Sequence, residues 1–150
     1  MHIADGIIPL ELSTAAWGLS LAGVWLCARK VEPLEISRMG MVASAGFVAS
    51  LIHFPLAGTS IHLGLFGLIG AILGMRAFPV IFTTLLFQTL LFQHGGLVSL
   101  GLNALNMGLG GVSGWQLFRL PLGPEPLRAF LAGFCGLLIQ SFLMAAEFEM

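Results

Sequence analysis

The sequence predicts an all-α integral membrane protein, a single domain built as a bundle of about six transmembrane helices. Of its 150 residues, 57% are hydrophobic and 9% are charged, whereas a soluble domain carries about 25% charged residues. The apolar runs are continuous. A membrane β-barrel would instead need strands of roughly ten residues in which apolar and polar residues alternate. The length suits one domain, so residues 1–150 are expected to form one unit.

The same composition excludes several classes of protein. Six basic and seven acidic side chains give a net charge of −1, too few charges to cover a solvated surface or to bind a phosphate backbone. A soluble enzyme, a nucleic-acid binder and a disordered tail are therefore excluded. The two cysteines, Cys27 and Cys135, lie within apolar runs and form no CxxC pattern.

Six apolar segments are long enough to be membrane helices, because a span needs roughly 20 apolar residues and its backbone groups must pair internally. They cover about residues 12–28, 36–54, 61–75, 78–92, 97–118 and 127–146. One helix over 61–92 would be about 48 Å long, well beyond the ~30 Å hydrocarbon core. Pro79 predicts a break near Arg76, since proline lacks a backbone donor and disfavours helix before it.

Glycines at steps of three or four residues predict close helix packing within the bundle. The third segment carries such a series at Gly64, Gly67, Gly70 and Gly74, and small-xxx-small pairs recur at Gly110 with Gly114 and at Gly18 with Ala22. Small residues let helices approach where lipid supplies no hydrophobic drive.

The basic residues predict the orientation in the membrane. All six lie between the first and second, third and fourth, or fifth and sixth segments: Arg29, Lys30, Arg38, Arg76, Arg119 and Arg128. Positively charged loops stay in the cytoplasm. We therefore expect the N-terminus, the loops at 53–62 and 93–96 and the C-terminus on the outer face of the cell membrane.

The four histidines all fall in the predicted outer half: His2, His53, His62 and His94. His53 and His62 flank a run rich in proline and glycine, which predicts a re-entrant loop or two helix ends. His94 precedes two glycines. Imidazole near a membrane is costly unless it is paired, ligated or hydrated. A histidine at a helix end commonly bonds a carbonyl, so that ordinary role stays open for each.

His2 differs because of its position. A free α-amine, the backbone nitrogen of residue 2 and the imidazole Nδ1 of His2 can close a five-membered and a six-membered chelate ring around one cation. Such in-plane nitrogen donors suit Ni(II) and Cu(II), which favour square-planar geometry. A second histidine such as His62 would complete four nitrogens.

Three ordered motifs resemble the CbiM/NikM family. Met1-His2-Ile3-Ala4-Asp5-Gly6 is similar to its MHIxDG opening, and Gly58-Thr59-Ser60-Ile61-His62-Leu63 to its GTSxHL loop. Phe92-Gln93-His94-Gly95-Gly96-Leu97 and the stretch to Asn103 resemble its HGGLxxLGxN segment. These proteins are the substrate-binding membrane components of energy-coupling-factor type cobalt and nickel importers.

The resemblance implies a metal site. Met1, through its amino group, His2, through its backbone nitrogen and ring, and His62 would surround a transported Ni²⁺ or Co²⁺ ion, while His53 and Asn103 would orient a ligand ring. The N-terminal segment would then fold back into the bundle. Asp5 is expected to anchor it or shape its turn, with Gly6 tolerating positive φ. His94 is a weaker candidate.

The resemblance also implies partners. A transmembrane coupling subunit, ATPase subunits and a small accessory membrane subunit would complete a prokaryotic inner-membrane importer. The sequence has no GxxxxGK[ST] phosphate loop, so ATP hydrolysis would come from the ATPases, and this chain would be no enzyme and hold no cofactor. The sequence departs from typical members, which continue beyond the sixth segment.

Two other functions remain as alternatives. A membrane redox subunit could hold haem axially between His53 and His94. A membrane hydrolase is disfavoured, because HExxH and GxSxG are missing and no acidic residue lies between Glu35 and Glu125. The choice between nickel and cobalt stays open.

Overall fold

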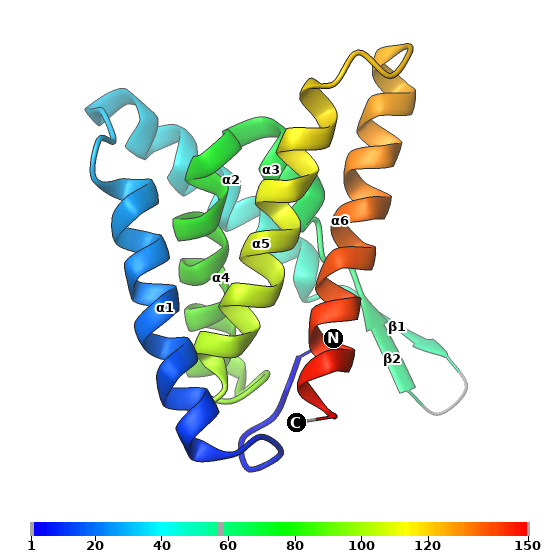
Figure 1. The fold of residues 1–150 in the computed structure, drawn as a ribbon. Helices are drawn as coiled ribbons and strands as arrows, with labels where there is room; N and C mark the ends of the chain where they lie inside the picture. Colours follow the sequence, from blue (N-terminus) through cyan, green and yellow to red (C-terminus); the bar gives the residue numbers. More distant parts are fainter. Residues whose placement is uncertain (1, 57–58, 150) are drawn as a thin grey trace.

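The computed structural model describes residues 2–56 and 59–149, and for residues 53, 55, 56 and 59–62 it describes the backbone. These parts of the chain are mostly helical, as predicted (Figure 1). The elements in chain order are α1 (Leu10–Ala28), α2 (Pro33–Ser50), β1 (His53–Leu56), β2 (Thr59–His62), α3 (Phe66–Leu73), the 3₁₀ turn η1 (Gly74–Arg76), α4 (Ala77–Phe92), α5 (Leu100–Arg119) and α6 (Glu125–Glu147).

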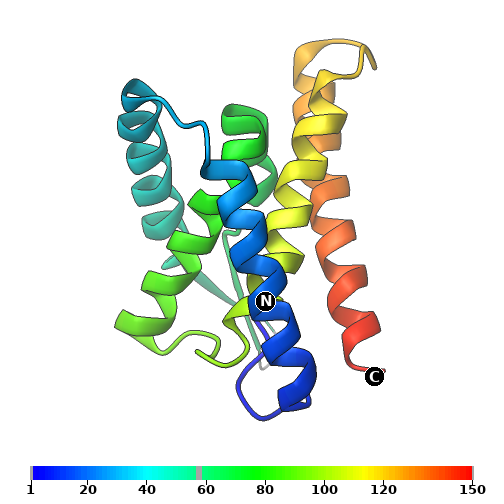
Figure 2. The ribbon, with the colours of Figure 1, turned by 60° about the vertical axis from the view of Figure 1, so that its left-hand side comes forward.

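Helix α5 is the centre of the bundle. It packs against α1, α3, α4 and α6, whereas α2 lies outside and packs mainly on α4 (Figure 2). The largest core cluster joins α3, α4 and α5 through Phe66, Ile81, Leu85 and Met107. Because α5 contacts helices on several sides, most of its residues from Leu100 to Gly111 are buried.

The glycines are where the helix backbones meet. A Cβ placed on Gly70 of α3 would overlap the carbonyl oxygen of Gly111 in α5. A Cβ on Gly114 would lie 2.9 Å from the carbonyl oxygen of Ala132 in α6. Gly18 of α1 has open space instead. The packing role predicted for the glycine series is therefore confirmed between α3, α5 and α6.

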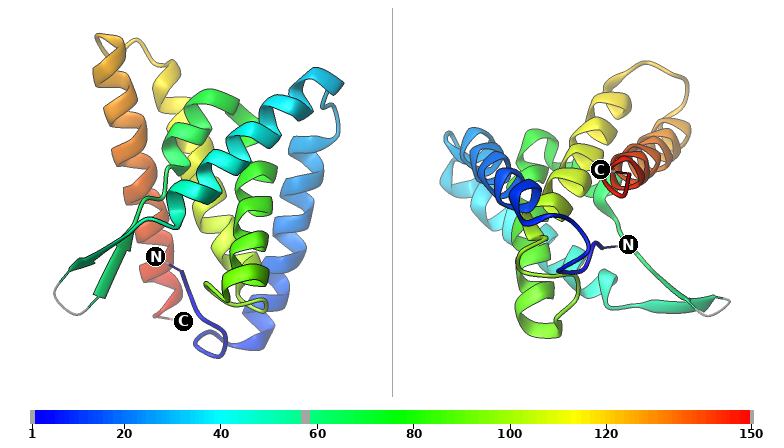
Figure 3. Two further views of the ribbon diagram at one scale, coloured as in Figure 1. Left: turned by 180° about the vertical axis from the view of Figure 1, so that it is seen from behind. Right: turned by 60° about the horizontal axis from the view of Figure 1, so that its bottom comes forward.

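The predicted break between the third and fourth segments is present, but its cause differs from the prediction. Helix α3 ends at Leu73, Gly74 adopts φ +60°, and α4 begins at Ala77, so that the chain turns at η1 and α4 runs back alongside α3 (Figures 1 and 3). Pro79 lies in the first turn of α4, where its missing N–H costs no hydrogen bond. Glycine, which adopts positive φ without steric cost, makes the turn.

The segment at 53–62 corrects two predictions. Its described residues, 53–56 and 59–62, form two antiparallel strands in which His53 pairs with His62 and Leu56 with Thr59, so the chain is not entirely α-helical, and these residues are strands rather than helix ends. The hairpin projects away from the helices (Figures 1 and 3). Helix α3 begins at Phe66 rather than at residue 61. Pro55 favours the extended backbone of a two-stranded ribbon, in which edge positions tolerate proline.

Three stretches among the described residues are long and apolar enough to cross a membrane: Leu10–Ala28, Phe66–Phe92 and Glu125–Glu147. The chain therefore has the helices of a membrane protein. The six-span topology predicted from the sequence stays a prediction.

The two ends of the bundle differ in charge. Arg29, Lys30, Arg38, Arg76, Arg119 and Arg128 all lie where α1 and α5 end, where α2 and α6 begin, or in η1. Arg76 joins these segments, because its guanidinium donates to the carbonyl oxygen of Lys30 at 2.6 Å and lies 3.4 Å from the Glu35 carboxylate. At the opposite end, where α1 begins and α6 ends (lower end in Figure 1), the charged residues are Asp5, Glu11, Glu147 and Glu149.

Replacement of Gly70 by alanine tests the glycine contact. We expect Gly70→Ala to lower the free energy of unfolding by about 1–3 kcal/mol, because its methyl group meets the Gly111 carbonyl of α5. Thermal unfolding of the protein in detergent measures the effect. Gly18→Ala is the matched control and should be neutral or slightly stabilising, since nothing lies within 4 Å of the new methyl group. Equal stability of the two variants would contradict the packing assignment.

Candidate metal-binding site

The residues that precede α1 are folded into the bundle. Ile3 is completely buried and packs with Ile8, Ala16, Leu102 and Met144, which come from this segment, α1, α5 and α6. A fully buried isoleucine contributes about 1.5–3 kcal/mol relative to an exposed one. The side chain next to His2 therefore holds the N-terminal segment inside the bundle.

Asn103 pairs with the backbone on both sides of the Ile3 side chain. The Ile3 N–H donates to Asn103 Oδ1 at 2.8 Å, and Asn103 Nδ2 donates to the Ile3 carbonyl oxygen at 2.9 Å. Asn103 lies in the first turn of α5 and is 1% exposed. Since a buried backbone group without a partner costs about 1–3 kcal/mol, this amide determines how the segment enters the bundle.

Ser99 and Asp5 hold the next residues. The Ser99 hydroxyl donates to the Ala4 carbonyl oxygen at 3.0 Å, and the Ser99 N–H donates to Asp5 Oδ1 at 2.8 Å. Asp5 thus places a carboxylate at the N-terminus of α5, where the helix dipole favours negative charge. Desolvation raises the pKa of Asp5, but hydrogen bonds from the backbone N–H groups of residues 97–99 outweigh it and bring the pKa below its ordinary value of 3.8. The carboxylate therefore stays ionised at neutral pH.

The loop between α4 and α5 closes over this segment through an unusual backbone. Gln93 adopts φ +52° and Gly95 φ +85°, a region that favours glycine and that Gln93 enters as the left-handed cap of α4. A Cβ on Gly96 would overlap the Asp5 carboxylate. The glycines after His94 thus allow the loop to approach the N-terminal segment at van der Waals distance.

This approach brings two histidine rings together. The centroids of the His2 and His94 rings are 4.5 Å apart, and their planes make an angle of 81°. The backbone holds His94 in turn, because its N–H donates to the Gln88 carbonyl oxygen at 3.2 Å and its own carbonyl accepts from the Thr89 hydroxyl at 3.2 Å. His94 therefore lies beside His2.

The structure places the predicted site residues in two groups. His2, Asp5, His94 and Asn103 lie together around the N-terminal segment. The backbones of His53 and His62 pair with each other where the hairpin joins the helices. Met1 and the side chains of His53 and His62 lie outside the described residues. Within the part of the chain that is described, no group of three or more His, Cys, Asp or Glu side chains could hold a metal ion.

Two residues at this site were not predicted from the sequence. Ser99 occupies the N-cap position of α5 without capping its own helix, because its hydroxyl bonds the N-terminal segment instead. Gln88 is a 2% exposed amide in a helix whose other polar side chains are threonines. A buried amide in such a helix is a signal, since buried polar groups in membrane segments need partners.

The arrangement suits nitrogen coordination by the start of the chain. Both backbone groups of Ile3 are hydrogen-bonded to Asn103. The backbone nitrogen and the ring of His2 therefore lie directly before a fixed residue. A chelate made from consecutive backbone and side-chain nitrogens needs those atoms held in one geometry. Preorganisation of this kind lowers the entropy lost on binding.

Comparison with known proteins gives one family. The family described as CbiM, cobalt uptake substrate-specific transmembrane region, matches residues 2–150. A putative metal transport protein of Haemophilus influenzae is 34% identical over 125 residues, covering 83% of this chain and 61% of the relative. The putative fused nickel transport protein NikMN of Archaeoglobus fulgidus is 30% identical over 98% of this chain and 52% of the relative. The chain thus spans about half to three fifths of these relatives.

Two solved structures have the same fold. A crystal structure of a truncated transition metal transporter superposes with a TM-score of 0.87 at 22% identity, covering 99% of this chain and 74% of that one. A second transition metal transporter gives a TM-score of 0.88 at 22% identity and covers 99% of this chain and 70% of that one.

Replacement of Asn103 tests the anchoring of the N-terminal segment. Asn103→Leu removes both bonds to Ile3, so we expect a loss of about 2–4 kcal/mol in the free energy of unfolding. Faster amide hydrogen exchange at residues 2–8 should accompany it. Asn106→Leu is the matched control, because Asn106 is equally buried one turn along α5 but donates to Glu147. Unchanged exchange at residues 2–8 in Asn103→Leu would contradict this role.

Proposed function

Because this chain belongs to the CbiM family, the cobalt uptake substrate-specific transmembrane region, we propose that it captures Ni²⁺ or Co²⁺ as the substrate-binding membrane component of an importer. The proposal is supported by the family match over residues 2–150 and by relatives named as cobalt and nickel transport proteins. The observation that carries it is the double hydrogen bond between Asn103 and Ile3, which fixes the chain next to His2.

The proposed ligands are four nitrogens: the amine of Met1 as a free terminus, the backbone nitrogen and ring of His2, and the ring of His62. Before it binds the ion, the amine must lose a proton from a group whose reference pKa is near 8. The His2 amide must ionise under the influence of the metal. In-plane nitrogen donors of this kind favour Ni²⁺ over hard cations such as Mg²⁺. His53, Asn103 and His94 would then orient the ligands, as outer partners commonly do at metal sites.

The charge distribution suits uptake of a cation. The end of the bundle that carries the N-terminal segment has four acidic residues, and all six basic residues lie at the other end. A surface of one sign raises the local concentration of ions of the other sign. The positive-inside rule places the basic end in the cytoplasm. In this orientation the site faces outward in a prokaryotic inner membrane.

Energy for transport would come from other subunits. The sequence lacks a phosphate loop, and the relative of Methanocorpusculum labreanum is named as a putative fused cobalt transport protein CbiMQ. We propose a transmembrane coupling subunit, paired ATPases and a small accessory membrane subunit as partners. Reorientation of the bundle against these subunits would release the ion. Protonation of the nitrogen ligands would assist release, because ligands must be deprotonated to bind.

Blocking the amino terminus tests the proposed Met1 ligand. A tag placed before Met1 removes the free amine, so we expect cellular Ni²⁺ or Co²⁺ accumulation in the presence of the partner subunits to fall to background. The same tag after Met150 serves as the control and should leave accumulation unchanged. Normal uptake with a blocked amine would contradict the proposed ligand set.

Substitution of two histidines tests which ring coordinates the ion. We expect His62→Ala to weaken Ni²⁺ affinity by more than about 100-fold, since it removes a ligand, and His94→Ala to weaken it by only about tenfold, the lower end of the cost of losing an outer partner. Isothermal titration of the purified protein measures both. The reverse order would overturn the assignment of His62. A Soret band in the purified protein would favour the alternative of a haem-binding subunit.

A further inference from the structure

A groove runs between α2 and α4. It consists of two adjoining pockets that share Ala43. One pocket, of about 200 Å³, reaches Ile36 and Pro79, and the other, of about 170 Å³, reaches Val48 and Leu91. Both helices begin at the basic end of the bundle, so this α2–α4 groove starts beside the basic end and runs toward the acidic one.

The length of the α2–α4 groove matches half a bilayer. From Ile36 to Val48 on α2, and likewise from Pro79 to Leu91 on α4, the helix rises about 18 Å. The hydrocarbon core of a bilayer is about 30 Å thick, so one leaflet takes up about 15 Å. An acyl chain that extends across one leaflet therefore has about the length of the groove.

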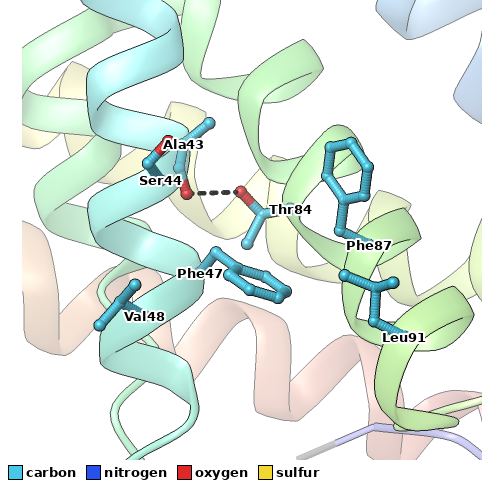
Figure 4. Close-up of a pocket in the computed structure, with 7 residues that line it drawn as sticks. All are labelled: Ala43, Ser44, Phe47, Val48, Thr84, Phe87 and Leu91. Atoms are coloured by element: carbon cyan, nitrogen blue, oxygen red, sulfur yellow. Dashed lines mark hydrogen bonds between the residues drawn. The ribbon is translucent and has the colours of Figure 1, made fainter.

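The walls of the groove suit a hydrocarbon chain. The described lining residues carry no charge, and the rings of Phe47 and Phe87, 6.5 Å apart, border the second pocket (Figure 4). Three lining hydroxyls each donate at 2.9 Å to the carbonyl oxygen four residues earlier in the same helix: those of Ser44, Thr83 and Thr84. Because these donors are already used, an apolar occupant leaves none of them without a partner.

The mouth of the groove is basic. Arg76 lies three residues before Pro79 and four before Val80, hence on the same face of the chain as it enters α4. Its side chain is 22% exposed and donates to the carbonyl oxygen of Lys30, which brings the exposed Lys30 to the same place. Glu35 balances one of these two positive charges. The other is available to an anion.

We propose that the α2–α4 groove binds an anionic phospholipid, with one acyl chain along the groove and the phosphate beside Lys30 and Arg76. Basic residues at a membrane surface attract anionic headgroups, and the acyl chain gains van der Waals contacts along both helices. Because α2 packs mainly on α4, the bound lipid extends the contact that attaches α2 to the bundle. This inference goes beyond metal capture and does not depend on it.

Native mass spectrometry of the full chain in detergent tests the preference for an anionic headgroup. Dioleoyl phosphatidylglycerol and dioleoyl phosphatidylcholine have the same acyl chains and differ in headgroup charge. We expect one bound lipid per chain and an affinity about fivefold higher for phosphatidylglycerol, the factor that one basic residue contributes near a membrane surface. Equal affinity for the two lipids, or no bound lipid, would overturn the proposal.

Lys30→Gln tests the mouth of the groove. We expect this variant to bind the two lipids equally, because it removes the positive charge that Glu35 leaves available. Arg119→Gln is the matched control, since it removes the same charge at the end of α5, a helix that contributes no residue to the described lining of the groove. It should keep the wild-type preference. An unchanged preference in Lys30→Gln would overturn the proposed headgroup contact.

Gly40→Leu tests the groove itself. Gly40 lines the first pocket, and a Cβ at this position meets nothing within 4 Å, so a leucine side chain enters the groove without displacing either helix. We expect the variant to lose the bound phosphatidylglycerol. Gly18→Leu is the matched control, because Gly18 is an exposed glycine of α1 with equally open space. It should bind the lipid as the wild-type protein does.

Thermal unfolding of the same proteins gives a second measurement. Phosphatidylglycerol should raise the Tm of the wild-type protein and of Gly18→Leu but not that of Gly40→Leu, because a ligand that binds only the folded state stabilises it. Wild-type binding by Gly40→Leu, or equal loss in Gly18→Leu, would show that lipid covers the surface at large and would overturn the groove. A dimer in the mass spectrum that Gly40→Leu dissociates would assign the groove to a second copy of the chain and would also overturn the proposal.

Discussion

The pairing of one asparagine side chain with the Ile3 backbone is the constraint on which the site depends. The start of a chain is ordinarily mobile, and an apolar bundle offers few partners for its peptide groups. Asn103 supplies both a donor and an acceptor at 2.9 Å and 2.8 Å, and the Ile3 side chain fills the core beside it. His2 is consequently held at the edge of the helices.

That constraint depends in turn on the rigidity of α5. The helix carries Ser99 and Asn103 at its start, and farther along the chain Gly111 and Gly114 lie against the backbones of α3 and α6. Where two helices touch through their backbone atoms, no side chain lies between them that could change its rotamer. The element that orients the N-terminal segment is therefore the most tightly packed element of the bundle, as a preorganised binding site requires.

The features of the acidic end support the proposed capture of a cation. Acidic residues gather at this end of the bundle, where they favour cations, and the rings of His94 and His2 are in contact there. The basic end has a different role. There Arg76 links the α1–α2 connection to η1 through Lys30 and Glu35.

The sequence by itself determined the helical membrane class, five of the six helices to within a few residues, and the separation of charge, because apolar runs and loop charges are local properties of the chain. It also gave His2, Asp5, His94 and Asn103 as candidate site residues through their motifs, and the structure places these four together. Only the tertiary structure decided that residues 53–56 and 59–62 pair as strands, that Gly74 makes the turn assigned to Pro79, and that Gln88 lines a pocket. Contacts such as that of Ile3 with Asn103, 100 residues apart, depend on how helices pack, and no local pattern encodes them.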